Sequence, residues 1–331
     1  MYMDTENLPS EYRPRLIIWQ LTPPLTDPAD SLPVLTLHEC ELIIDSISEV
    51  SKPIVVFTGP SITARTDLYN IVRYGNKHGL KTIIEVTPDD VTDDVINQFQ
   101  QFGPRIFRLS IEDIIVEDSD TRFQRTTAYL QLEETIKKLR TKGFEIHLSI
   151  KVPQPDLRKL EYYLDYAFRC NAQGLYCHLR FDKSIPEIFM SDGCSQSLDE
   201  FIGKISEMKS QVPNEMYFSP QCVKYIPFSL DNNDFDFSNI THPRWIHCCL
   251  AGKSFGFIAE NGKVYLCGTR CKECGDLREY NYDFHRLWSE ADLFNLLRPY
   301  NRTCVQTRLL FKEQNILYDK QDEMFKEIIG V

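Results

Sequence analysis

The chain has 331 residues, of which 42% are hydrophobic, and it carries a formal net charge of −11. A chain of this length can bury a large core and can hold one large domain together with a smaller one. Its acidic balance argues against a broad phosphate-binding surface, so we expect no nucleic acid partner.

The N-terminal residues and the cysteines indicate the cellular compartment of the protein. Residues 1–15 contain no basic start followed by an apolar stretch, and no segment reaches about 18 uninterrupted apolar residues, so we expect no membrane partner. The 11 cysteines are an odd number in a chain without an export signal. They fit reduced thiols and metal ligands better than a disulfide framework, which predicts a cytoplasmic protein.

The first two thirds of the chain alternate strand and helix patterns. Thr36, followed by Glu39 three residues later, is typical of a capping box that begins a helix. Apolar runs predict strands at 15–19, 53–58, 81–86, 105–110, 144–150 and 174–181. Helical spacing predicts helices at 36–50, 66–78, 92–102, 122–142, 156–171 and 197–210. The alternation predicts a parallel sheet with helices outside it, closed or partly closed as a barrel, and such folds bind ligands at the carboxyl ends of their strands.

The predicted strand at 144–150 has a polar face. Glu145, His147 and Ser149 alternate with three apolar residues, and alternate residues of a strand point to opposite faces. A polar barrel interior is consistent with a binding cavity. It is equally consistent with polar residues that form hydrogen bonds with one another inside the barrel.

Cysteines gather in the last third of the chain. A hairpin is predicted from 255–258 to 263–266, because Asn261-Gly262 lies between two apolar alternations. Directly after it, three cysteines have the C-x3-C-x2-C spacing that lets thiolates turn toward one soft metal centre. We predict that the metal ligands come from Cys249, Cys267, Cys271, Cys274 and Cys304, with Cys248 as an alternative to Cys249.

These thiols have three interpretations. An iron–sulfur cluster takes cysteine ligands, a structural zinc site uses four thiolates at similar spacing, and a cysteine can also be buried as a small apolar side chain. The lysine and arginine that flank the closely spaced cysteines argue against the last interpretation. The spacing alone does not separate iron from zinc.

The composition divides the chain into two domains and a linker. Residues 227–245 are polar and acidic, without a clear period, and we interpret them as a linker or a covering loop. The α/β domain then covers residues 1–226, and the cysteine module with the C-terminal tail covers 246–331.

Together these residues resemble the radical S-adenosylmethionine (SAM) family with a C-terminal SPASM or twitch module. Residues 13–22 are similar to the strand that leads into the cluster loop of that family, and Thr58-Gly59 lie where its SAM-binding glycine motif begins. The more specific similarity is C-terminal, at Cys249, Gly252, 262–267, 275–278, 287–288 and 297–298. The resemblance implies a partial (β/α)6 TIM-like barrel with a small cysteine-rich hairpin-plus-helix module.

The same resemblance implies that the family's reaction is missing. The three cysteines that hold the SAM-cleaving [4Fe-4S] cluster fall on Leu25, Ala29 and Leu32, none of which binds iron. The glycine-rich motif that holds the methionine amino group of SAM falls on residues 59–61, Gly-Pro-Ser, and lacks its acidic residue. SAM is therefore not an expected cofactor, and no catalytic residue is assigned.

The function implied is that of a degenerate radical SAM protein. We expect a pseudoenzyme or partner protein in peptide or cofactor maturation, which binds a peptide, a tetrapyrrole-type ligand or an active paralogue. The further cysteines of a full SPASM module are absent after Cys274, so one [4Fe-4S] cluster is the most it would carry. The alternatives are an iron–sulfur enzyme of radical SAM type that uses the C-terminal cysteines, and a structural zinc-binding protein.

Overall fold

The computed structural model describes residues 12–24, 33–111, 115–117, 123–152, 157–179, 207, 217–221, 252–266 and 273–297. The chain forms two compact units. The first contains residues 1–86, 97–104 and 248–331, and the second contains residues 87–96 and 105–247. Helix α3 (Asp93–Phe102) has residues in both units.

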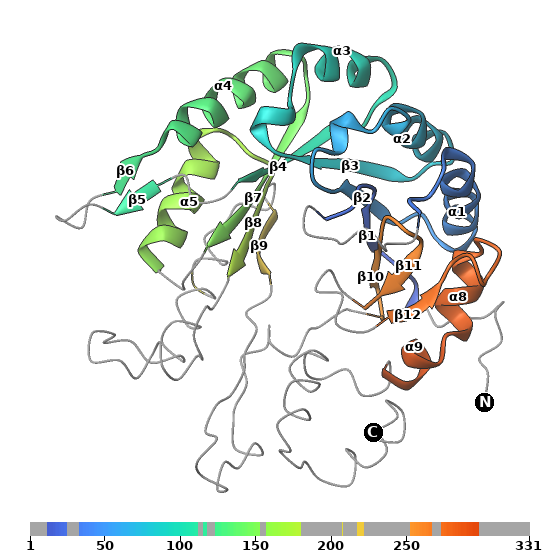
Figure 1. Cartoon of the computed structure of the whole chain (residues 1–331). Helices are drawn as coiled ribbons and strands as arrows, with labels where there is room; N and C mark the ends of the chain where they lie inside the picture. Colours follow the sequence, from blue (N-terminus) through green and yellow to red (C-terminus); the bar gives the residue numbers. More distant parts are fainter. Residues whose placement is uncertain are drawn as a thin grey trace, which may run out of the picture. The chain divides into compact units, whose positions relative to one another are not determined.

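The first unit is built on a sheet with the strand order β12-β11-β10-β1-β2-β3 (Figure 1). The strands β10, β1, β2 and β3 run parallel, and the hairpin strands β11 and β12 continue the sheet antiparallel. The C-terminal hairpin thus extends the sheet that the N-terminal strands begin. The strands are β1 (Leu16–Gln20), β2 (Ile54–Thr58), β3 (Lys81–Val86), β10 (Phe255–Ile258), β11 (Lys263–Tyr265) and β12 (Glu273–Asp276).

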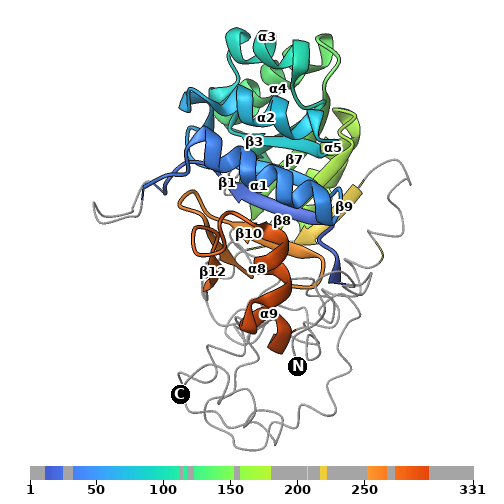
Figure 2. The same cartoon turned by 90° about the vertical axis from the view of Figure 1, so that its right-hand side faces the viewer.

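Helices of the first unit come from both ends of the chain. They are α1 (Leu37–Val50), η3 (Ile62–Ala64), α2 (Leu68–Lys77), α8 (Phe284–Glu290) and α9 (Asp292–Leu297). The side chain of Ser46 on α1 donates to Asp283 Oδ1 at 2.9 Å and accepts from the backbone N–H of His285 at 3.0 Å. These two bonds tie the start of α8 to α1, and Figure 2 shows the two helices side by side.

Trp288 is the largest side chain in the core that α8 makes with the sheet. Its ring centroid lies 5.6 Å from that of Phe284 and 4.5 Å from that of Phe294, and its indole N–H donates to the carbonyl of Tyr12 at 2.7 Å. A Cβ atom at Gly256 would lie 2.9 Å from the indole ring. The glycine in β10 therefore gives Trp288 the space to pack directly on the strand.

The strands within the second unit are parallel and have the order β4-β7-β8-β9. The strands are β4 (Ile106–Ile111), β7 (Glu145–Val152), β8 (Gly174–Leu179) and β9 (Tyr217–Gln221). Helices α4 (Thr127–Thr141) and α5 (Leu157–Arg169) pack against β7 and β8. The remaining elements are η4 (Pro88–Asp90) and the hairpin strands β5 (Ile115–Glu117) and β6 (Phe123–Arg125).

The six strands predicted from apolar runs are confirmed as β1, β2, β3, β4, β7 and β8, and so is the α/β class with parallel strands. The sequence did not predict β9, because it contains Pro220, which has no N–H to donate and is tolerated only at the edge of a sheet. The helix predicted from residue 122 begins later, since residues 123–125 form β6. The helix predicted at 197–210 lies outside the described residues except for position 207. Barrel closure and the domain boundaries stay predictions.

Within the described part of the chain, none of the helices combines the length and apolar character that a membrane crossing needs.

Candidate functional site

The candidate site lies where β1, β2 and β10 end. Because the three strands are parallel, their carboxyl ends meet at one edge of the sheet, which is where folds of this kind bind ligands. The connection from β1 to α1 leaves this edge at Leu21 and returns to it at Leu35. Positions 25, 29 and 32, where the cluster cysteines of the family would fall, lie outside the described residues.

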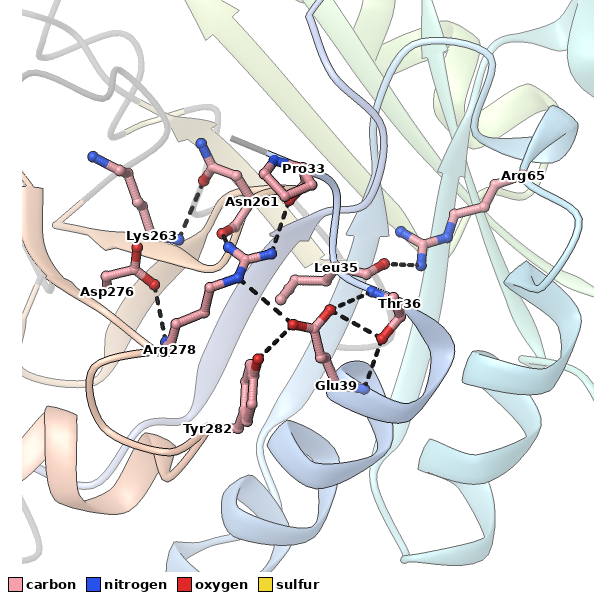
Figure 3. A network of polar contacts seen from close by, with 10 residues as sticks. All are labelled: Pro33, Leu35, Thr36, Glu39, Arg65, Asn261, Lys263, Asp276, Arg278 and Tyr282. Atoms are coloured by element: carbon pink, nitrogen blue, oxygen red, sulfur yellow. Dashed lines mark hydrogen bonds and ion pairs between the residues drawn. The ribbon is translucent and has the colours of Figure 1, made fainter. Parts of the chain in front are cut away.

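Arg65 holds both ends of this connection. Its guanidinium donates to the carbonyl of Leu21 at 2.8 Å. It also donates to the carbonyl of Leu35 at 2.6 Å (Figure 3). Asp67 fixes the orientation of the group through an ion pair of 2.6 Å to Nε, and the Arg65 side chain is only 9% exposed. One buried cation therefore closes the loop at its base. The sequence contained no signal for this role, and a surface arginine would have been the default interpretation.

Arg278 holds the returning end from the other side. It follows β12, and its Nη2 donates to the carbonyl of Pro33 at 2.8 Å while Nη1 donates to the carbonyl of Asn261 (Figure 3). The backbone of the hairpin turn adds a further bond, from Leu35 N–H to the carbonyl of Glu260 at 2.8 Å. The C-terminal hairpin thus holds the residues that lead into α1.

Glu39 connects the start of α1 to this arrangement. The capping box is confirmed, since the Thr36 N–H donates to Glu39 Oε2 at 2.7 Å and the Thr36 side chain accepts from the Glu39 N–H. The other carboxylate oxygen of Glu39 accepts a hydrogen bond from the Tyr282 hydroxyl and lies 3.6 Å from Arg278 Nε. Burial would raise the pKa of the Glu39 carboxyl, but the hydrogen bonds from Tyr282 and Thr36 and the charge of Arg278 outweigh it and lower the pKa.

We expect Glu39→Gln to lower the free energy of unfolding by about 1–3 kcal/mol at neutral pH, because it weakens the cap and the charge-assisted bonds. A lowered native pKa stabilises the fold above the ordinary glutamate pKa of about 4.3, and this contribution is lost as the pH falls through the native pKa. Urea unfolding at several pH values should therefore show the difference between the two proteins shrinking in acid. Glu134→Gln, on an exposed pair with Lys138, is the control; a difference independent of pH would contradict the assignment.

The loop after β2 packs closely on the residues that follow β1. Gly59 has a φ of 141°, and a Cβ atom there would lie 2.2 Å from Thr22 Oγ1. The Thr22 hydroxyl donates to the carbonyl of Pro60 at 2.8 Å. Residues 59–61, which align with the SAM-binding motif of the resembled family, are thus a glycine in close contact with Thr22, a proline and a serine. None of the three has a carboxylate side chain.

Cys40 contacts Arg65, which binds both ends of the connection after β1. It is fully buried on α1, and its Sγ accepts from Arg65 Nη2 at 3.7 Å. Burial raises the pKa of the Cys40 thiol to about 12, although the nearby Arg65 opposes this. The side chain therefore packs as a neutral thiol, which is not suited to bind a metal.

Cys274 is the one predicted metal ligand within the described residues, and it lies at an irregularity of β12. Val264 faces Gly275 and Tyr265 faces Glu273, so Cys274 is the additional residue of a β-bulge. A bulge re-aims the side chain that it carries, and the Cys274 side chain is partly exposed. The other predicted ligands, Cys249, Cys267, Cys271 and Cys304, lie outside the described residues, and within them no three metal-binding side chains come together.

No protein-family model matches the chain. Its sequence is 24% identical over 302 residues to an AdoMet-dependent heme synthase of Methanosarcina barkeri, covering 86% of this chain and 85% of that protein. It is also 24% identical over 277 residues to an AdoMet-dependent heme synthase of Oleidesulfovibrio alaskensis, covering 80% of this chain and 69% of that protein.

Solved structures share the fold. Streptococcus suis SuiB bound to S-adenosylmethionine is similar with a TM-score of 0.58 and 13% identity, over 87% of this chain and 66% of SuiB. The enzyme anSMEcpe with bound AdoMet and a peptide is similar with a TM-score of 0.53 and 11% identity, over 96% of both chains. The solved structures share the α/β fold of this chain, so the fold that the radical SAM resemblance implied is confirmed.

Proposed function

We propose that this chain is a radical SAM superfamily protein that does not cleave SAM and instead binds a tetrapyrrole-type ligand during cofactor maturation. The absence of SAM cleavage is proposed from the residue types in the loop after β1. A [4Fe-4S] cluster is held by cysteine thiolates, and residues 21–39 contain no cysteine. The residues present therefore do not fit the SAM-cleaving cluster.

The geometry around the loop supports this proposal. Protein groups hold the base of the loop, because Arg65 and Arg278 bind the backbone carbonyls at its two ends. The residues that would hold the amino group of SAM are replaced by Pro60 and Ser61, and the Pro60 carbonyl already accepts from Thr22. These contacts hold the two described ends of the connection after β1 without a metal centre.

The ligand class is proposed from the sequence relatives. The heme synthases align with most of the chain, and heme, the product in their name, is a tetrapyrrole. A peptide ligand is the weaker choice, because the peptide-bound structures are similar in fold at 11–12% identity and thus support the fold alone. An active paralogue would then be the protein that supplies or receives the tetrapyrrole.

A second candidate function is that of an iron–sulfur protein that uses the C-terminal cysteines. Cys274 lies at a bulge, partly exposed, and Cys267 and Cys271 precede it at a spacing that cysteine-ligated metal centres use. Bound to this part of the chain, such a cluster would supply electron transfer. It would not replace the missing SAM-cleaving cluster, because its ligands belong to the C-terminal hairpin.

Two measurements on the anaerobically purified full chain test the proposal. Reduced protein incubated with SAM should form no 5′-deoxyadenosine above a protein-free control, while an active radical SAM enzyme assayed beside it does. The same protein should bind protoporphyrin IX saturably, measured by quenching of tryptophan fluorescence. Formation of 5′-deoxyadenosine would overturn the non-cleaving assignment, and lack of saturable porphyrin binding would overturn the ligand class.

A further inference from the structure

The residues between β12 and α8 form a tightly hydrogen-bonded segment, which we call the strap (residues 277–283). The carbonyl of Leu277, a fully buried residue, accepts from the backbone N–H groups of Tyr280 at 3.2 Å and Tyr282 at 2.7 Å. The N–H of Leu277 donates to the carbonyl of Gly262 at 3.0 Å. The strap is therefore anchored on the turn of the C-terminal hairpin and is held by bonds within itself.

Two contacts join the strap to the entrance and first turn of α1. Arg278 Nη2 donates to the carbonyl of Pro33 at 2.8 Å. The Tyr282 hydroxyl donates to Glu39 Oε1 (Figure 3). The partners are 245 and 243 positions apart in the chain, and all four residues belong to the first unit. The strap thus connects the C-terminal hairpin with residues 33–39.

Tyr282 makes its contact from an unfavourable backbone conformation. Its φ is +63°, and the φ of Asn281 before it is +52°. Asparagine takes this left-handed conformation readily, whereas a large aromatic residue rarely does, so other contacts must stabilise Tyr282 there. Its bonds to Leu277 and Glu39 do so. The strap therefore has a closed state with these bonds and an open state in which Tyr282 returns to an ordinary conformation.

The strap begins shortly after Cys274, the predicted metal ligand in β12. Cys274 is the additional residue of the bulge, and only Gly275 and Asp276 separate it from Leu277. Asp276 is bound to the strap, since its Oδ1 accepts from the backbone N–H of Arg278 at 2.9 Å. A displacement of Cys274 would therefore reach Arg278 over four residues, along backbone that β11 and these bonds hold in place.

We propose that metal binding by Cys274 is coupled through the strap to residues 33–39. The inference rests on the second candidate function, in which the hairpin cysteines bind a metal, and adds an effect at the strand ends. A thiolate bound to a metal is fixed in position, which holds β12 at its bulge and keeps the strap closed on Pro33 and Glu39. Loss of the metal lets β12 move and favours the open strap. Metal occupancy thereby controls the order of residues at the edge of the sheet where folds of this kind bind ligands.

Hydrogen–deuterium exchange of the anaerobically purified full chain measures this coupling. Metal-loaded protein is compared with the same protein after treatment with 1,10-phenanthroline, which binds both iron and zinc. The amides of Leu35 and Thr36 report on the strap, because they donate to the Glu260 carbonyl and to Glu39 Oε2. Removing the metal should raise their exchange rates about 10-fold, within the usual range of coupling between two sites. Residues 68–77, which form α2 in the same unit, are the internal control and should not change.

Arg278→Gln should disconnect residues 33–39 from the metal. In this variant their amides should exchange fast with and without the metal, while the metal content equals that of the unaltered protein. A merely structural role of Arg278 would raise the exchange and leave the metal-dependent difference in place. Arg286→Gln, at an exposed arginine paired with Glu290, is the matched control and should keep the full metal response.

The outcomes separate the coupling from the functions on which it depends. Equal exchange of residues 33–39 in metal-loaded and metal-free unaltered protein would overturn the coupling and leave the hairpin metal standing. Unaltered protein that binds no metal would overturn the coupling together with the second candidate function, and neither result concerns tetrapyrrole binding. Circular dichroism shows whether Arg278→Gln folds. Should it not fold, Tyr282→Phe, which loses only the bond to Glu39, should lower the metal-dependent difference without removing it.

Discussion

Cys274→Ser should remove most of the iron and sulfide that the protein carries when it is purified anaerobically from iron-supplied cells. We expect about four irons per chain in the unaltered protein, the content of one [4Fe-4S] cluster. Loss of one thiolate from a cysteine-ligated cluster leaves an iron without its ligand, so the visible absorption of the cluster should fall with the iron content. Chemical iron and sulfide analysis together with the absorption spectrum measure the effect.

Cys170→Ser is the matched control for this substitution. Cys170 is buried in the second unit and donates to the carbonyl of Ala167 at 3.6 Å, and burial raises the pKa of its thiol to about 11. A neutral thiol of this kind is not a metal ligand, so the control should keep its iron. If the unaltered protein carries zinc in place of iron and the Cys274→Ser variant lacks it, the result would support the structural zinc alternative. An unchanged metal content in Cys274→Ser would remove Cys274 from the ligand set.

Arg65→Leu should lower the free energy of unfolding by about 3–5 kcal/mol, the range for breaking a buried charged interaction from one side. The substitution leaves the carbonyls of Leu21 and Leu35 without their donor and Asp67 without its cation. Arg65→Lys keeps the charge but has no fork to reach both carbonyls, so it should lose less than the leucine variant. Urea unfolding followed by tryptophan fluorescence measures the loss, since Trp19 and Trp288 are both buried in this unit.

Arg286→Gln is the control for the arginine substitutions. Its guanidinium pairs with Glu290 one helical turn away and is 53% exposed, and such pairs contribute about 0.3–0.5 kcal/mol. If Arg65→Leu lowered the free energy of unfolding by only this small amount, the two ends of the connection after β1 would not depend on the hydrogen bonds of Arg65. This result would also remove the main geometric support for a connection whose two ends are held without a metal centre.

Local signals in the sequence were sufficient for the individual elements. Alternating apolar residues predicted β7, the capping box at Thr36 predicted where α1 begins, and Asn261-Gly262 predicted the turn between β10 and β11. Each of these features depends on residues within a few positions of one another, because helix caps and hairpin turns are made by neighbours in the chain. The absence of cysteine between residues 21 and 39 is likewise a property of the sequence, and the non-cleaving proposal depends on it.

Tertiary structure decided which distant residues meet. Arg278 and Pro33 are 245 positions apart, and nothing in either local pattern predicts their hydrogen bond. The parallel pairing of β10 with β1, the bulge at Cys274 and the stacking of Arg108 on Tyr176 also depend on which strands become neighbours. Periodicity determines which face of a strand is buried, whereas the partner of that face follows from the packing of the whole unit. The sequence therefore determined the elements and the absence of cysteine from residues 21–39. Only the folded chain determined the contacts of Arg65 and Arg278 and the stacking of Arg108 on Tyr176.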